Sequence, residues 1–232
     1  MSLLELSGVH TYYGDSHILE GVDLSVEEGE VVALAGRNGV GKTTTLRSIL
    51  QLTPPRSGSI GYREESLVGL ATHEVAERGV GWIPEDRRIF AQLSVEENLR
   101  AAIPDAAAVE AGLDVAFDAF PILEERRNQD AGTLSGGQQQ MLAIARGLVG
   151  ENDLLLVDEP SEGLAPQIVA DVAEALSRAA EETTILLVEQ YLPLALDLSD
   201  RFYIVDNGRV VDDGRTANVT ADDERFRRYL SA

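Results

Sequence analysis

The chain has 232 residues, of which 44% are hydrophobic, and it contains no cysteine. This length is enough to bury the core of one α/β domain with an inserted subdomain, and the lack of thiols excludes disulfides, thiolate metal sites and cysteine catalysis. Forty acidic and nineteen basic residues give a formal net charge of −21. Such a charge argues against nucleic acid as a partner, because nucleic-acid binding depends on basic patches.

The distribution of apolar and charged residues also predicts where the protein works. No apolar run reaches the length of a membrane span, and residues 1–10 lack the basic and apolar regions of a signal peptide, which predicts a cytoplasmic protein. Lys42 is the only lysine, against eighteen arginines. An acidic, lysine-poor surface suits molar salt, where screening removes self-repulsion, so we hypothesise a halophilic source. The alternative is a surface charge that only serves solubility.

In chain order, the hydrophobic pattern predicts strands and helices that alternate as in an α/β protein. The expected strands are residues 3–9, 17–26, 31–35, 59–62, 79–84, 154–157, 184–188, 202–205 and 209–211. Residues 10–14 are expected to form a loop. The expected helices are one that follows residue 43 and ends before Pro54, and then residues 72–78, 94–102, 105–120, 122–127, 135–149, 165–180 and 222–230. We interpret the chain as a single domain whose core lobe is residues 1–85 and 151–232, with a helical insertion at about 86–150.

A glycine-rich loop follows the apolar strand 31–35 and precedes a helix. Its pattern of glycines, lysine and hydroxyl is typical of loops that bind nucleotide phosphates through backbone N–H groups at a helix N-terminus. Lys42 would supply a cation to the terminal phosphates, and the Thr43 hydroxyl would bind Mg²⁺. The alternative is a glycine turn before an ordinary helix. The residues expected to bind the phosphates are Gly36, Arg37, Asn38, Gly39, Val40, Gly41, Lys42, Thr43 and Thr44.

Two further apolar strands also end in polar residues, Asp158-Glu159 after 154–157 and Glu189-Gln190 after 184–188. Ligands of parallel α/β sheets lie beyond the carboxyl ends of the strands, so these ends are candidates for the same site. Asp158 is expected to hold Mg²⁺ and Glu159 to accept a proton from an attacking water. In isolation, the stretch 154–160 would be only a buried strand and a turn.

Leu134-Ser135-Gly136-Gly137-Gln138 predicts a capped helix N-terminus. Ser135 and Gln138 fit a capping box and need no further function. Two successive glycines in the first turn lower helix stability, but they allow a phosphate to approach bare N–H groups.

Together, the loop 36–43, the stretch 134–138, and the stretch 154–159 with its continuation Ser161-Glu162-Gly163-Leu164 resemble the ATP-binding subunits of ABC transporters. The resemblance implies a P-loop NTPase fold, with a RecA-like, mostly parallel sheet core, an N-terminal antiparallel β subdomain and an inserted helical subdomain. It also implies ATP and Mg²⁺ as cofactors and a head-to-tail dimer. In that dimer Ser135, Gly136 and Gly137 would contact the γ-phosphate held by Lys42 of the other subunit, and Tyr13 would stack on adenine.

The sequence departs from the general family pattern at two positions. Glu85 stands where most members have glutamine, and Gln190 stands where most have histidine. Glutamine donates a hydrogen bond but does not titrate near neutral pH, so Gln190 is expected to orient the phosphate and Glu159 to take the proton. Glu85 can bind Mg²⁺ but repels a phosphate when it is ionised. We therefore expect slower ATP hydrolysis.

Both departures look like the ATPases of branched-chain amino acid importers, as do the stretches 84–90, 161–166 and 187–190. The stretches 12–19 and 36–41 look more like the related urea or short-chain amide importers. The resemblance implies transmembrane permease subunits as partners on the inner face of the membrane, a homodimer or a heterodimer with a sister ATPase, and an indirect link to an extracytoplasmic solute-binding protein. Alternatives are a soluble ATPase that acts on DNA or ribosomes, and a weakly hydrolysing regulatory partner. Arginine pairs such as Arg87-Arg88 are expected to be solvated or ion-paired.

The halophile hypothesis predicts that salt stabilises the protein. At 1 M salt the Debye length is about 3 Å, so repulsion among the acidic side chains is screened. The melting temperature should therefore be several degrees higher in molar KCl than in 50 mM KCl, measured by circular dichroism. An equal melting temperature in both buffers would contradict the hypothesis.

Overall fold

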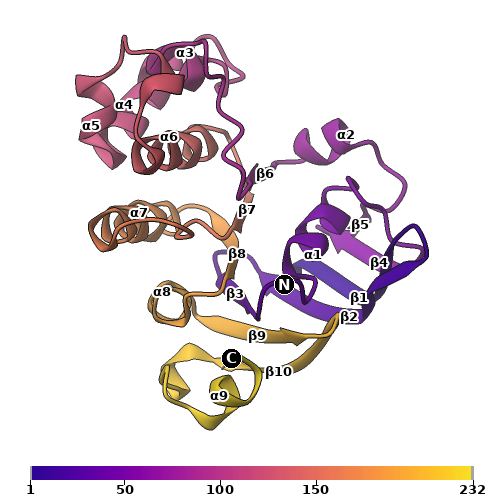
Figure 1. Cartoon of the computed structure of the whole chain (residues 1–232). Helices are drawn as coiled ribbons and strands as arrows, with labels where there is room; N and C mark the ends of the chain where they lie inside the picture. Colours follow the sequence, from indigo (N-terminus) through magenta and orange to yellow (C-terminus); the bar gives the residue numbers. More distant parts are fainter. Residues whose placement is uncertain (1, 231–232) are drawn as a thin grey trace. The chain divides into compact units, whose positions relative to one another are not determined.

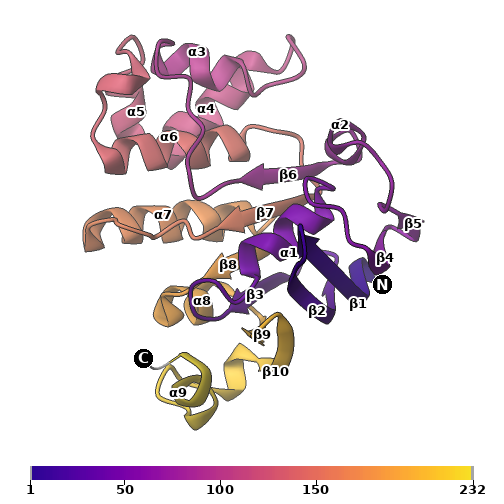
Figure 2. The same cartoon turned by 45° about the vertical axis from the view of Figure 1, so that its right-hand side comes forward.

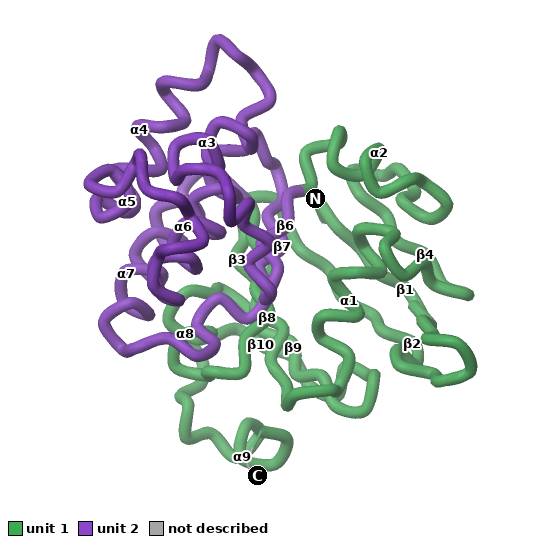
Figure 3. The backbone as a smooth tube through the Cα atoms, turned by 45° about the horizontal axis from the view of Figure 1, so that its top comes forward, with its two compact units in different colours: residues 1–80, 184–232 green, residues 81–183 purple. Residues whose placement is uncertain are grey.

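The computed structural model describes residues 2–230, which form two compact units. Unit 1 comprises the chain up to residue 80 and from residue 184, and unit 2 comprises residues 81–183 (Figure 3). In the described part of the chain, every helix is too short or too polar to span a bilayer.

Unit 1 begins with an antiparallel sheet of strand order β2-β1-β4-β5 (Figure 1). Its strands are β1 (Ser2–Tyr13), β2 (Ser16–Glu27), β4 (Ser57–Tyr62) and β5 (Glu65–Ser66). The predicted loop at residues 10–14 is wrong, because β1 continues to Tyr13, which pairs with Ser16. Aromatic and β-branched residues favour strands, and Gly14 supplies the positive φ of 58° that the tight turn needs.

The second sheet of unit 1 contains the parallel core. β3 (Val31–Ala35) lies between β8 (Thr184–Glu189) and β9 (Arg201–Asp206) and is parallel to both, while β10 (Arg209–Arg215) is antiparallel to β9. Every residue of β3 and β8 is buried, as expected for strands that are covered on both faces. Ala35 pairs with Glu189, so the carboxyl ends of β3 and β8 lie side by side.

Short helices complete unit 1. They are α1 (Lys42–Ile49), α2 (Thr72–Ala76), α8 (Leu192–Leu198), α9 (Glu224–Leu230) and the 3₁₀ turn η2 (Thr216–Asn218). The sequence pattern did not predict α8, which packs on β3 and β8. Phe202, Ala195 and Phe226 bring β9, α8 and α9 into one buried cluster, with the two phenylalanine rings 4.9 Å apart between centroids.

Unit 2 combines two neighbouring strands with a group of helices (Figure 2). The elements are β6 (Val80–Ile83), α3 (Val95–Arg100), α4 (Val109–Ala119), α5 (Pro121–Glu125), the 3₁₀ turn η1 (Ala131–Thr133), α6 (Gly136–Leu148), β7 (Leu154–Asp158) and α7 (Pro166–Ala179). Helices α3, α4, α5 and α7 all contact α6, which is therefore the centre of the unit. The limits of the helical insertion, 86–150, remain a prediction.

The predicted fold class is confirmed, because the chain combines parallel strands, an antiparallel sheet and helices in an α/β fold. The predicted start of α3 is also confirmed. Ser94 Oγ accepts from Glu97 N at 3.2 Å and Glu97 Oε2 accepts from Ser94 N at 2.8 Å, which completes the capping box. In contrast, α4 begins at Val109, four residues later than the expected start at residue 105.

Candidate functional site

The loop between β3 and α1 requires glycine at three positions. Gly39 and Gly41 have φ of 82° and 114°, in the left-handed region that side chains disfavour. A Cβ on Gly41 would lie 2.7 Å from Leu19 Cδ2, and one on Gly36 would lie 2.6 Å from the carbonyl oxygen of Val205. The glycines are therefore needed both for the backbone conformation and for close packing.

The turn between β9 and β10 supports this loop from the side. Gly208 N donates to Val40 O at 2.9 Å, and Gly208 O accepts from Glu20 N at 2.8 Å. Asn207 and Gly208 have φ of 46° and 74°, as expected for the Asn-Gly turn of a hairpin. The loop is thus tied to β2 and to the β9–β10 hairpin before any ligand binds.

Lys42 is held inside the loop. Its side chain is buried, and its Nζ donates to Gly36 O at 2.8 Å and to Arg37 O at 3.0 Å. The first turn of α1 contains no acidic residue, so the positive end of the helix dipole is not neutralised there. This combination of ammonium, helix N-terminus and glycine backbone fits an anionic ligand such as a phosphate chain.

The end of β8 lies beside the start of the loop, because Glu189 is the partner of Ala35. Glu189 is buried, and its Oε2 accepts from Tyr191 N at 2.9 Å. Gln190 follows at the same edge of the sheet, and its side chain is exposed. The structure therefore brings Gln190 and the phosphate loop to one edge, as expected for strands 31–35 and 184–188.

The structure distinguishes the two candidate aromatic residues at the end of β1. The Tyr12 ring stacks on His17, with centroids 4.1 Å apart, and the Arg56 guanidinium lies 4.2 Å from the Tyr12 centroid. Tyr13 is 43% exposed. Tyr12 therefore packs within the protein, whereas Tyr13 is accessible to a base.

In unit 2, β7 ends in two buried carboxylates. Asp158 is fully buried and Glu159 is 9% exposed. Glu159 has a φ of 43°, a left-handed conformation that costs about 1–3 kcal/mol for a residue other than glycine. Such strain is concentrated at functional sites, which is consistent with the predicted role of Glu159.

Glu85 interacts with other acidic residues of unit 2. Glu85 is an exposed residue, but partial desolvation of its carboxyl raises its pKa, and a hydrogen bond with Glu162 and the negative charges of Glu162, Glu159 and Asp86 raise it further. Like charges that lie this close favour protonation of one member. Glu85 and Glu159, which the sequence predicts to lie in one site, are therefore near each other. Glu162 was missed, because nothing in the local sequence links it to Glu85.

The residues present fit a magnesium ion bound mainly by its substrate. Among residues 2–230, no group of three or more histidine or acidic side chains is arranged to hold a metal ion alone. Mg²⁺ usually keeps several waters and binds one or two carboxylates together with substrate phosphates. A hydroxyl at Thr43 and carboxylates at Asp158 and Glu85 are oxygen ligands of the kind that this ion prefers.

The N-terminus of α6 has the predicted capping box. Ser135 Oγ accepts from Gln138 N at 3.4 Å, and Gln138 Oε1 accepts from Ser135 N at 3.1 Å. A Cβ on Gly136 would lie 3.4 Å from Arg87 Nη1, and one on Gly137 would lie 3.3 Å from Ile168 Cγ1. These contacts are close but not prohibitive, so packing alone does not require both glycines.

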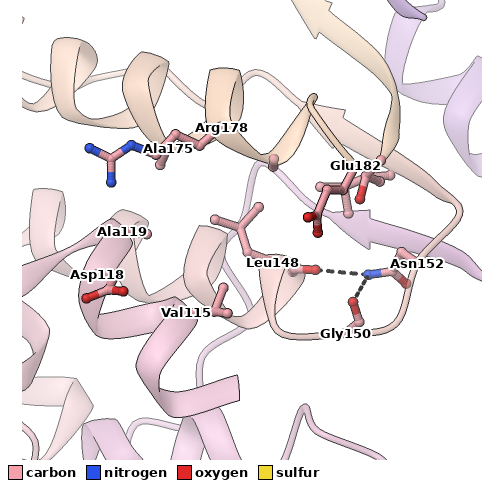
Figure 4. Close-up of a pocket in the computed structure, with 13 residues that line it drawn as sticks. Val115, Asp118, Ala119, Leu148, Gly150, Asn152, Ala175, Arg178 and Glu182 are labelled. Atoms are coloured by element: carbon pink, nitrogen blue, oxygen red, sulfur yellow. Dashed lines mark hydrogen bonds between the residues drawn. The ribbon is translucent and has the colours of Figure 1, made fainter. Parts of the chain in front are cut away.

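A cavity of about 360 Å³ lies elsewhere in unit 2, among α4, α6 and α7 (Figure 4). Val115, Leu148 and Ala175 form part of its wall, and the Asn152 amide at its edge donates to the carbonyl oxygens of Gly147 and Gly150. None of the thirteen lining residues belongs to the predicted nucleotide site.

Comparison with known proteins identifies the family. The family described as ABC transporter matches residues 19–162. The chain belongs to the ABC transporter family.

This ABC ATPase is 43% identical to the high-affinity branched-chain amino acid transport ATP-binding protein BraG of Pseudomonas aeruginosa, over 90% of this chain and 91% of that protein. It is 37% identical to the probable branched-chain amino acid transport ATP-binding protein LivF of Archaeoglobus fulgidus, over 93% of each chain. Among solved structures, it is similar to an ATP-binding subunit of an ABC transporter, with 32% identity and a TM-score of 0.82 over 100% of this chain and 95% of that chain.

Family membership confirms several predictions. The protein is an ATP-hydrolysing subunit that uses ATP and Mg²⁺ and works with transmembrane permease components of a transporter. The roles of individual residues, and the slower hydrolysis expected from Glu85 and Gln190, remain predictions.

The raised pKa of Glu85 predicts a pH-dependent stability change. Because the pKa of Glu85 is raised in the folded state, its ionised carboxylate destabilises the fold. This destabilisation is absent when the pH is below the pKa of the unfolded state, and it is complete when the pH is above the pKa of the folded state. Glu85→Gln should therefore raise the melting temperature of the magnesium-free protein at pH 7, and the gain should disappear near pH 4.

Glu96→Gln is the matched control. Hydrogen bonds from Arg100 and Arg127 lower the pKa of Glu96, so its ionised form stabilises the fold above the unfolded-state pKa. Glu96→Gln should lower the melting temperature at pH 7, and this loss should shrink as the pH falls. If both substitutions changed the melting temperature at pH 7 in the same direction, the opposite pKa shifts of Glu85 and Glu96 would be contradicted.

Proposed function

We propose that this ABC ATPase powers the import of branched-chain amino acids. The observation that carries the ATPase chemistry is the phosphate loop, in which a buried lysine is held by two backbone carbonyls at a helix N-terminus. The proposed substrate class rests on the relatives BraG and LivF, which are named for branched-chain amino acid transport and align over nearly the whole chain. Relatives named for Nod factor export and lipopolysaccharide export are 36% and 31% identical.

In this proposal the loop residues 36–44 bind the phosphates through backbone N–H groups, and Lys42 neutralises the terminal phosphates. The exposed Tyr13 stacks on adenine. Thr43, Asp158 and Glu85 hold Mg²⁺, which supplies charge to the leaving phosphate oxygens. The support for these roles is the geometry of unit 1, the buried carboxylate that ends β7 and the family to which the chain belongs.

Glu159 accepts the proton of the attacking water, because it is a buried carboxylate next to the proposed metal ligand. Gln190 donates a hydrogen bond to a phosphate oxygen and orients it. The amide has no basic form at neutral pH, so the whole proton transfer depends on Glu159. Glu159 has an unusual left-handed backbone conformation, which supports a role in which its side chain must point in one fixed direction.

The working form in this proposal is a head-to-tail dimer, either of this chain with itself or with a sister ATPase. Ser135, Gly136 and Gly137 of one subunit bind the γ-phosphate held by Lys42 of the other, through the bare N–H groups at the start of α6. The subunits lie on the cytoplasmic face of the membrane against permease subunits, and an extracytoplasmic solute-binding protein delivers the substrate to those permeases. The net charge of −21 supports the exclusion of nucleic acid.

Two substitutions should separate binding from hydrolysis. Glu159→Gln should keep ATP affinity but lower kcat at least about a hundredfold, because general-base catalysis contributes about 10²–10⁴. Lys42→Ala should lose ATP binding itself, since the cation that faces the phosphates is gone. Equilibrium binding of labelled ATP and phosphate release would measure both, and the Glu159→Gln protein should elute as a dimer with ATP. Undiminished turnover in either variant would contradict the proposed roles.

The substrate class is tested in the complex with its permease and binding protein, reconstituted in proteoliposomes. Leucine, isoleucine or valine should stimulate ATP hydrolysis and be accumulated, whereas urea and acetamide should not. Stimulation by urea or acetamide alone would favour the urea or short-chain amide alternative. Stimulation by none of them, with the ATPase active, would reject both substrate classes.

A further inference from the structure

The segment that follows β6, residues 84–90, has an unusual backbone. Arg87 and Arg88 have φ of 60° and 48°, so two successive residues with side chains adopt the left-handed conformation. Each costs about 1–3 kcal/mol, and such a conformation persists only where the surrounding contacts hold it.

Helices α3 and α6 hold the second half of this segment. Arg146 of α6 donates from Nη1 to Arg88 O at 2.7 Å, and its guanidinium lies 4.7 Å from the centroid of the Phe90 ring. Asn98 of α3 is fully buried, accepts from Phe90 N at 2.8 Å and donates to Phe90 O at 3.0 Å. These contacts fix the backbone at residues 88–90.

The Arg87 side chain connects the segment to the first turn of α6. Arg87 Nε donates to Gln140 Oε1 at 3.0 Å, Nη1 donates to Gln139 Oε1 at 3.5 Å, and Gln140 is 2% exposed. Nη1 also lies 3.4 Å from the position that a Cβ on Gly136 would occupy. Gly136 and Gln140 are four residues apart and share a face of the helix, so the guanidinium covers the outside of the twin-glycine turn.

The neighbouring Arg88 lacks these contacts. It donates from Nε to Asp86 Oδ1 at 2.9 Å in an ion pair whose side chains are 52% and 64% exposed, and its guanidinium lies 4.7 Å from the centroid of the Trp82 ring. The sequence predicts that both arginines are solvated or ion-paired. This expectation holds for Arg88 and is wrong for Arg87, whose guanidinium bonds to two glutamines of α6.

We propose that Arg87 is a positioning residue that fixes the twin-glycine turn of α6 to the segment 84–90. Glycines destabilise a helix turn by about 1 kcal/mol each relative to alanine, and they offer no side chain for packing. The guanidinium of Arg87 supplies that packing from outside the helix, and because it carries only donors it does not occupy the N–H groups of the turn.

A cation beside a helix N-terminus is disfavoured by the helix dipole until an anion binds there. The expected effect of Arg87 on ATP hydrolysis rests on the proposed function, because the turn that Arg87 orders is the one proposed to bind the γ-phosphate held by the partner subunit. Arg87 therefore acts through the α6 turn.

The test compares Arg87→Gln with Arg88→Gln, which removes an arginine from the adjacent left-handed position. In the nucleotide-free protein, hydrogen exchange of the Gln138 and Gln139 amides, which bond to Ser135 Oγ and to the Ser135 carbonyl oxygen, should be several-fold faster in Arg87→Gln and unchanged in Arg88→Gln. The kcat for ATP should fall about tenfold in Arg87→Gln, while the Kd for ADP, measured by titration with a fluorescent ADP, should stay within twofold of the unmodified protein. A role in overall stability alone would speed exchange throughout unit 2 and would not separate kcat from ADP affinity.

Gln140→Leu removes the acceptor of the Arg87–Gln140 hydrogen bond. It replaces Arg87→Gln in the test if the Arg87→Gln protein does not fold. It should also speed exchange of the Gln138 and Gln139 amides, and adding it to Arg87→Gln should bring little further change. Equal exchange of the Gln138 and Gln139 amides in the Arg87→Gln and Arg88→Gln proteins would overturn the proposal. If the unmodified protein showed no ATP hydrolysis, the proposed function would fail, but the difference in exchange would still support the positioning role.

Discussion

The nucleotide site depends on the attraction between an anion and a cation that the backbone already holds in place. Lys42 Nζ is bound by two carbonyl oxygens of the loop it belongs to, and the N–H groups at the start of α1 have no acidic neighbour in the first turn. The chain carries a net charge of −21, yet charges more than about 8–10 Å away are largely screened at physiological salt. Groups within a few ångströms of the phosphates therefore determine binding, and an acidic surface is compatible with an anionic ligand.

Unit 2 differs from the cationic phosphate loop of unit 1, because several of its carboxylates lie close together. Desolvation raises the pKa of Glu85, and Glu162 and Glu159 lie close enough to raise it further. Asp158 is fully buried at the end of β7. Carboxylates that lie this close repel one another when all are ionised. A divalent cation or a proton shared among them removes the repulsion. Proton transfer and metal binding are thus consistent with unit 2, while the cationic phosphate loop belongs to unit 1.

Features that depend on neighbouring residues were predicted well. The capping boxes at Ser94 and Ser135 formed as expected, because a cap joins groups three residues apart. The buried strands β3, β7 and β8 were also found, since a short apolar run between turn residues is a local signal. The loop expected at residues 10–14 was wrong, because pairing with β2 extends β1 to Tyr13. Helix α8 was missed, because seven residues with a proline near the start carry little helical periodicity and the helix depends on packing against β3 and β8.

The amino-acid order alone therefore specifies the phosphate loop, the acidic strand end at Asp158-Glu159, the twin-glycine turn and the family, because each is written in consecutive residues. Other parts of the site join residues far apart in the chain and appear only once the chain folds. Gly208 supports Val40, Glu162 bonds to Glu85, and Arg87 bonds to Gln140 of α6. No spacing rule relates such pairs, since the path of the chain between them decides whether they meet.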